Sequence, residues 1–179
     1  MTAVELWVPP PHQINCSMPP LSRDMFAFTL DNVKGEIIAC DTNSCDQLTE
    51  TGWKVFVPEL LEGRWYHTSA VTSKGLLLVG GGGSWNTTES VPFNGGESVK
   101  SFPLEPGRYL HCSIQITEST IVLTGNGGPT PHNAVHEYSN LEGEVTSREL
   151  PSLIFARYNH ACGMYSVGTS KVSLGLNVI

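Results

Sequence analysis

The chain has 179 residues, of which 10 are basic and 17 acidic, and its formal net charge is −7. Nucleic acids and anionic membrane surfaces bind clustered lysine and arginine, so this balance argues against both as partners. No run reaches the roughly 18 consecutive apolar residues that a membrane helix needs, and the first residues lack the basic and apolar regions of a signal peptide.

One short motif, arginine followed by an aromatic residue, a variable residue and histidine, occurs three times. The copies are Arg64-Trp65-Tyr66-His67, Arg108-Tyr109-Leu110-His111 and Arg157-Tyr158-Asn159-His160, and their arginines are 44 and 49 residues apart. A weaker copy begins at Arg23, 41 residues before Arg64, with Phe26 in the histidine position. Self-similarity at a period of about 20–50 residues is typical of repeat architectures.

Each repeat contains short strand-like segments separated by turn residues. Apolar, β-branched and aromatic runs of about four to eight residues, bounded by turn residues, predict strands. In chain order the predicted strands are 4–8, 13–17, 35–41, 51–58, 65–72, 76–79, 109–117, 120–124, 134–138, 144–150, 158–164 and 171–176. Four strands per repeat describe one blade of a β-propeller, so the sequence predicts an all-β fold.

Residues at fixed places in these repeats give the chain a resemblance to the kelch family. Gly80-Gly81 and Gly127-Gly128 follow apolar strands, Trp53 and Tyr138 lie in later strands, and proline-containing segments lead to Arg64 and Arg157. The resemblance covers nearly the whole chain and is greatest to divergent, cysteine-containing kelch-type proteins of invertebrates. It implies a kelch-type β-propeller of four-stranded antiparallel sheets.

The repeat starts divide one propeller region, residues 1–179, into blades. Residues 1–22 are the end of a preceding blade, 23–63, 64–107 and 108–156 are blades, and 157–179 is an incomplete blade. The two partial blades together hold four predicted strands. The chain is therefore expected to form about four blades' worth of propeller. This is either a partial propeller or a small ring closed by both termini, which would leave no exposed sheet edge.

The repeated residues are interpreted as structural. They are Arg23, Arg64, His67, Gly80, Gly81, Arg108, His111, Gly127, Gly128, Arg157 and His160. A repeated arginine commonly donates to main-chain carbonyls and a nearby carboxylate. The alternative for the histidines is a metal site at a central channel, but equal repeat positions place each histidine in its own blade. No metal or cofactor is therefore expected, and the glycines are expected to serve turns.

Five cysteines and two Asn-x-Ser/Thr sequons bear on the compartment. Cys40 and Cys45 are the candidate disulfide, because they could close a short hairpin. Cys112 and Cys162 fall at adjacent repeat positions, and adjacent strand residues face opposite sides, which argues against a bridge between them. The candidate glycosylation sites, if the chain is secreted, are Asn15 and Asn86. An extracellular location is slightly favoured.

The sequence predicts a non-catalytic module that binds a protein or glycan through the loops between its strands. The candidate loops are 84–92, 129–133 and 42–50. Trp85 is the candidate anchor if its side chain is exposed, and the equal alternative is that it folds back onto the blade. No Gly-x-Ser-x-Gly nucleophile motif occurs. Two other functions stay open. One is an intracellular kelch adaptor that recruits substrates. The other is a fragment of a copper radical oxidase-type propeller, which the resemblance allows through its Tyr, His and Cys residues.

Overall fold

The computed structural model describes residues 27–127, 132–167 and 170–176, and within these ranges it contains strands and no helix. The strands are β1 (Thr29–Val33), β2 (Glu36–Cys40), β3 (Cys45–Thr49), β4 (Gly52–Val57), β5 (Thr68–Val71), β6 (Gly75–Val79), β7 (Thr87–Pro92), β8 (Val99–Pro103), β9 (Cys112–Thr117), β10 (Thr120–Thr124), β11 (Val135–Ser139), β12 (Thr146–Leu150), β13 (Ala161–Val167) and β14 (Ser170–Leu176). The predicted all-β fold is confirmed. The predicted strands 4–8 and 13–17 and the repeat start at Arg23 lie outside the described residues.

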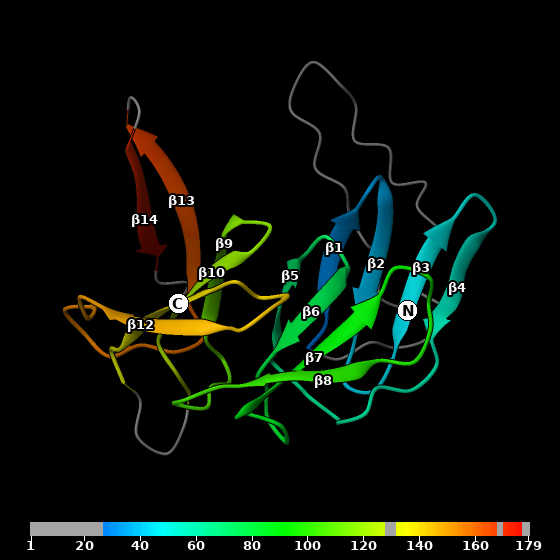
Figure 1. Cartoon of the computed structure of the whole chain (residues 1–179), viewed down its shortest axis with the longest axis horizontal. Helices are drawn as coiled ribbons and strands as arrows, with labels where there is room; N and C mark the ends of the chain where they lie inside the picture. Colours follow the sequence, from blue (N-terminus) through cyan, green and yellow to red (C-terminus); the bar gives the residue numbers. More distant parts are fainter. Residues whose placement is uncertain (1–26, 128–131, 168–169, 177–179) are drawn as a thin grey trace.

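The strands form three four-stranded antiparallel sheets, each made of strands consecutive in sequence. Their orders are β1-β2-β3-β4, β5-β6-β7-β8 and β9-β10-β11-β12, and β13 and β14 form a two-stranded hairpin. In Figure 1 the sheets follow one another from right to left, with the β13–β14 hairpin at the upper left. Short turns join neighbouring strands, so each sheet is a meander like a propeller blade. We call the three sheets blades 1, 2 and 3.

The first strand of each blade lies beside the first strands of its neighbours. β1 packs against β5, β5 against β9, and β9 against β13. Ser69 Oγ on β5 donates a hydrogen bond to Asp31 Oδ2 on β1 at 2.7 Å, and the main-chain N–H of Val71 donates to Gln115 Oε1 on β9 at 3.0 Å. The blades therefore stand around a common axis in a β-propeller arrangement, with β1, β5, β9 and β13 innermost.

Two hydrophobic cores fill the spaces between successive blades. β6 is buried at every position, and its alternate side chains enter different cores because successive strand residues face opposite sides. Leu76 and Leu78 pack with Ile38 of blade 1, whereas Leu77 packs with Leu123 of blade 3. The continuous apolar run in β6 is therefore explained by a strand that has a blade on each side.

The turn into each innermost strand has the same backbone conformation in all four repeats. A residue with φ between 49° and 57° stands two positions before each strand; these residues are Ala27, Tyr66, Leu110 and Asn159. Such left-handed backbone is not extended, so the strands begin later than the predicted starts at 65, 109 and 158. The residue between, which we call the slot residue, is Phe28, His67, His111 or His160. The slot of the first repeat is thus Phe28, which corrects the assignment to Phe26.

The glycine positions also align differently from the sequence-based assignment. Gly80 follows β6 with φ 59°, and Gly125 follows β10 with φ 69°. The next residues make matching hydrogen bonds, from Gly81 N to the Arg108 carbonyl at 2.9 Å and from Asn126 N to the Arg157 carbonyl at 3.1 Å. Gly125 and Asn126 therefore occupy the places of Gly80 and Gly81. Gly127 stands one position further along, and Gly128 lies outside the described residues.

Candidate functional site

The repeated arginine of blade 2 is buried and bonded on several sides. Arg64 Nη1 donates to the Gly80 carbonyl at 2.9 Å, and Nη2 donates to Glu89 Oε2 at 3.0 Å. Both side chains are 1% exposed. Glu89 Oε1 accepts further hydrogen bonds from the Leu61 main-chain N–H and from Ser98 Oγ. This network ties the turn before β5 to the end of β6, to β7 and to the segment before β8.

The arginine of blade 3 has a histidine where blade 2 has the glutamate. Arg108 Nη1 donates to the Gly125 carbonyl at 2.7 Å, and Nη2 lies 2.7 Å from His136 Nδ1. Because a guanidinium only donates, His136 Nδ1 is the acceptor and its ring is neutral. Burial lowers the pKa of Arg108 to about 10. Burial, followed by the Arg108 charge, lowers the pKa of His136.

The slot histidines are buried and reach threonine hydroxyls. His111 Nε2 lies 2.8 Å from Thr68 Oγ1 of the preceding blade, and His160 Nε2 lies 2.8 Å from Thr124 Oγ1. His67 Nε2 lies 3.4 Å from Thr29 Oγ1 on β1, and its Nδ1 lies 3.0 Å from the Arg64 carbonyl oxygen in its own turn. The rings therefore hold neighbouring blades together.

Glycine is required where these rings pass. A Cβ on Gly125 would collide with the Arg157 carbonyl and would lie 2.6 Å from His160 Cε1, and a Cβ on Gly80 would collide with the Arg108 carbonyl.

The structure also brings the three histidines to a single cavity at the end of the axis. The cavity has a volume of about 180 Å³ and is lined by Ala27, Phe28, Tyr66, His67, Leu110, His111, Asn159 and His160. We call this cavity the axial mouth. It is built from the left-handed residue and the slot residue of every repeat. Among the described residues, no group of three or more His, Cys, Asp and Glu side chains is arranged to hold a metal ion.

Burial keeps the slot histidines neutral and makes the protein sensitive to acid. Burial lowers the pKa of His67 to about 4 and that of His111 to about 3, against an ordinary value of 6.5. The unfolded chain takes up protons below pH 6.5 while the folded protein does not, so stability falls as the pH drops through this range. In the His111→Gln variant, the loss of unfolding free energy between pH 7 and pH 5 is expected to be smaller by about 2 kcal/mol. Urea unfolding at the two pH values measures it, and an unchanged difference would contradict the buried neutral ring.

Five exposed aromatic side chains lie at the same end of the molecule as the axial mouth. They are Phe28, Trp65, Tyr66, Trp85 and Tyr158, which are 37%, 41%, 38%, 48% and 55% exposed, and we call them the aromatic end. The backbone places them together. The Arg108 N–H donates to the Trp85 carbonyl at 2.6 Å, the Leu110 N–H to the Tyr66 carbonyl at 3.2 Å, and the Asn159 N–H to the Leu110 carbonyl at 2.7 Å. Trp65 covers Gly82 and Gly83, where any Cβ would meet its indole.

The predicted binding loops are shorter in the structure than in the sequence-based assignment. Most of 84–92 is strand β7, and most of 42–50 is strand β3. Trp85 remains in the connection between β6 and β7, where it is exposed. Asn86 beside it is exposed as well. Residues 129–131 of the third loop and Asn15 lie outside the described residues.

Two disulfides occur in the described chain. Cys40 at the end of β2 bonds to Cys45 at the start of β3, as predicted. Cys112 on β9 bonds to Cys162 on β13, contrary to the expectation from repeat positions. The two cysteines face opposite sides of their own strands, but they belong to neighbouring blades. A disulfide between neighbouring blades needs the first cysteine to point toward the next blade and the second to point toward the preceding one. Cysteines that face opposite sides of their own strands meet this requirement.

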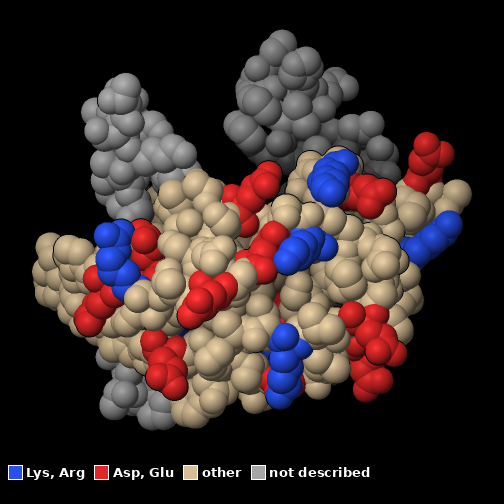
Figure 2. Space-filling model, in the orientation of Figure 1, with Lys and Arg blue, Asp and Glu red and all other residues tan. Residues whose placement is uncertain are grey.

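Charges are scattered over the surface. Figure 2 shows the basic side chains of the face in view separated from one another by acidic and uncharged residues. Two ion pairs join exposed or half-exposed groups, Arg148 with Glu137 at 2.8 Å and Lys100 with Glu62. The described residues include no helix with the length and hydrophobicity needed to cross a membrane.

Neither a protein-family model nor a curated protein matches the chain. Among solved structures, the chain is similar to one titled "Structure of YjhT", with a TM-score of 0.60 and 9% sequence identity over 76% of this chain. The chain spans about half the length of that protein, 51%. At this identity the likeness concerns the fold, and it agrees with the propeller-type arrangement of the blades.

Proposed function

We propose that this chain is a kelch-type propeller module that binds a protein or glycan at its aromatic end and catalyses no reaction. The observation that carries the proposal is the set of five exposed aromatic side chains in the turns at this end of the blades, two of which, Phe28 and Tyr66, line the axial mouth. Aromatic residues are enriched among the side chains that dominate binding energy. Exposed apolar patches on soluble proteins commonly mark interaction sites.

The scaffold beneath the aromatic end supports this proposal. Arg64 and Arg108 fix the turns that carry Trp65 and Tyr66 and that lie beside Trp85. A rigid aromatic anchor loses little conformational entropy when it binds. The aromatic end can therefore present its side chains already in place. The separated basic side chains likewise support a partner other than nucleic acid or an anionic membrane.

The two disulfides favour an extracellular setting over the intracellular adaptor, because disulfides persist mainly in oxidising compartments. They also weigh against the oxidase alternative, because Cys112 and Cys162 on the innermost strands are bonded to each other. The mass of the intact protein from a secretory host tests the setting. A sugar on Asn86 together with two disulfides would support an extracellular protein, and a bare, fully reduced chain would oppose it.

Replacing Trp65 and Trp85 together with alanine is expected to abolish partner binding, because both side chains are exposed anchors at the aromatic end. Partners captured by the wild-type protein are compared, by quantitative mass spectrometry, with those captured by the double variant. A Val55→Ala variant is the control, because Val55 is 60% exposed but lies on β4. A partner retained by the tryptophan variant would place binding elsewhere.

A further inference from the structure

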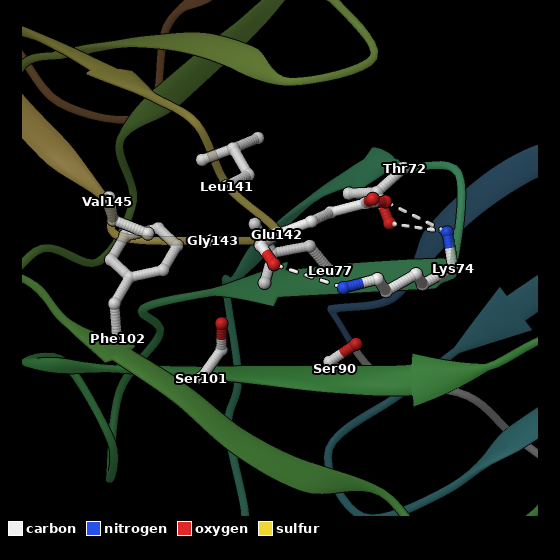
Figure 3. Close-up of a pocket in the computed structure, with 10 residues that line it drawn as sticks. All are labelled: Thr72, Lys74, Leu77, Ser90, Ser101, Phe102, Leu141, Glu142, Gly143 and Val145. Atoms are coloured by element: carbon white, nitrogen blue, oxygen red, sulfur yellow. Dashed lines mark hydrogen bonds between the residues drawn. The ribbon is translucent and has the colours of Figure 1, made fainter.

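A second cavity lies between blades 2 and 3, at the end of β5 away from the axial mouth. It has a volume of about 220 Å³. Its walls come from the turn between β5 and β6, from β7 and β8, and from the turn between β11 and β12. Figure 3 shows Phe102 and Val145 on one side, Leu141 above, Ser101 and Ser90 below, and Lys74 on the side opposite Phe102. The walls of the cavity thus contain both apolar and polar groups.

A β-bulge aims two neighbouring residues of β8 into this cavity. Thr87 pairs with Pro103 and Glu89 pairs with Lys100, so Ser101 and Phe102 together stand opposite Thr88 alone. Thr88 Oγ1 accepts a hydrogen bond from Phe102 N at 2.8 Å and donates to the Phe102 carbonyl at 2.6 Å, which holds the bulge. In a regular strand these two side chains would face opposite sides. Bulges that redirect side chains are frequent next to functional sites.

The acidic group at the cavity is hydrogen-bonded to the turn between β5 and β6. Glu142 accepts hydrogen bonds from Ser73 Oγ at 2.6 Å and from the Lys74 main-chain N–H at 2.9 Å. These bonds, with that from Ser73 the largest cause, lower the pKa of Glu142. Its carboxylate is therefore an ion held against the turn between β5 and β6. It fastens blade 3 to blade 2.

Three hydrogen-bond donors remain available. Lys74 Nζ donates to the Glu142 carbonyl oxygen at 3.0 Å but forms no ion pair among the described residues, and an ammonium has two further N–H groups to donate. The hydroxyls of Ser90 and Ser101 make no hydrogen bond within the described part of the chain. One ammonium and two hydroxyls that line the same cavity are suited to a carboxylate.

The apolar part of the cavity wall is firmly packed. Phe102 stacks on Tyr138 with 5.6 Å between ring centroids, and Leu77, Leu141 and Val145 complete this part of the wall. The volume is below the roughly 300 Å³ at which pockets for drug-sized ligands begin. The cavity therefore has room for a single apolar group about the size of one amino-acid side chain.

We propose that this cavity binds a small carboxylate carrying an apolar group, with the carboxylate at Lys74, Ser90 and Ser101 and the apolar group against Phe102. Two sources supply this chemistry: a free branched or aromatic carboxylic acid, and the C-terminal residue of a peptide that ends in a hydrophobic amino acid. The site is separate from the aromatic end, and its test does not depend on binding there.

The test follows the amide chemical shifts of the isotope-labelled protein during titration with 4-methylpentanoate and with its neutral isostere 4-methylpentanamide. The acid is expected to shift the amides of Ser101, Phe102 and Leu141 at millimolar concentration, and the amide to bind about fivefold more weakly, as loss of an exposed charge interaction predicts. A second pair of probes, acetyl-Gly-Gly-Leu as free acid and as C-terminal amide, distinguishes the sources. Tighter binding of the peptide acid than of 4-methylpentanoate assigns the site to chain ends, and the reverse assigns it to small acids.

Variants at Lys74 distinguish the effect of its charge on binding from an effect of the substitution on folding. Lys74→Met is expected to remove the preference for the acid over the amide, whereas Lys74→Arg is expected to keep it. Lys54→Met on β4 is the control, because Lys54 is exposed and is not among the residues that line the cavity. The proposal is overturned if acid and amide bind equally, if Lys74→Met behaves like Lys54→Met, or if none of the four probes shifts the cavity amides.

Discussion

Replacing Glu89 with glutamine is expected to lower the free energy of unfolding by about 3 kcal/mol, because the buried charge of Arg64 loses its nearer carboxylate and keeps only that of Glu62, 3.7 Å away. The side chains of Arg64 and Glu89 are 1% exposed and their charged atoms are 3.0 Å apart. Water cannot reach the guanidinium to replace the lost partner. The amide also offers a single acceptor oxygen, where both carboxylate oxygens of Glu89 now accept hydrogen bonds. Urea-induced unfolding at pH 7 measures the change.

A surface pair of similar geometry provides the control. Arg148 and Glu137 are 2.8 Å apart, but Arg148 is 68% exposed, so Glu137→Gln is expected to change stability by about 1 kcal/mol or less. If Glu89→Gln lowered the free energy of unfolding no more than Glu137→Gln does, the prediction of a buried, charged Arg64 would be wrong.

Local sequence patterns predict most strands of this fold, but β1, β3, β7 and β8 were missed, and the segments of β3 and β7 were assigned to loops. β6 and β10 are apolar runs bounded by turn residues, and both form where the pattern places them. The repeat of arginine, aromatic residue and histidine also marks the entry to each innermost strand correctly. Burial of Arg64 and Arg108 explains why this arginine recurs, since each donates to the main chain of its own blade.

Features that depend on contacts between blades could not be read from single repeats. The left-handed turns at Tyr66 and Leu110 are formed by residue types that seldom take positive φ. The local sequence therefore does not indicate that the strands begin after these residues. The pairing of Arg64 with Glu89 crosses 25 residues of sequence, although a glutamate within the otherwise uncharged strand β7 was a usable signal. Cys112 and Cys162 were compared as positions on one strand, whereas they lie on two.

The features of the candidate site also fall into two groups, those that depend on local sequence and those that depend on contacts between repeats. The polar loop around Trp85 is a local property that made Trp85 a candidate anchor, but its exposure was decided by the structure. The axial mouth could not be predicted from one repeat, because it is assembled from one turn of each repeat. The cavity at Lys74 needed the bulge at Ser101 and Phe102, and a register shift of one residue leaves no mark in the composition of β8.

Replacing Cys112 and Cys162 together with alanine is expected to lower the free energy of unfolding by about 4 kcal/mol. The disulfide spans a sequence separation of 50 residues, and cross-linking a loop of that length removes about this much free energy from the unfolded chain on the entropic account. The bond also fastens β13 to β9, the innermost strand beside it. Urea unfolding under non-reducing conditions measures the loss, and faster amide exchange is expected in β13 before global unfolding.

The second disulfide gives the comparison that isolates loop length. Cys40 and Cys45 are separated by 5 residues, for which the same relation gives about 2 kcal/mol. Both cysteines are fully buried within blade 1, so replacing them with alanine is expected to leave amide exchange in β13 unchanged. If the Cys112 and Cys162 variant were as stable as the wild type, or if mass analysis found free thiols at both positions, the link between blade 3 and β13 would be refuted. Conversely, β13 exchanging faster in that variant alone would show that the bond between the blades holds the hairpin in place.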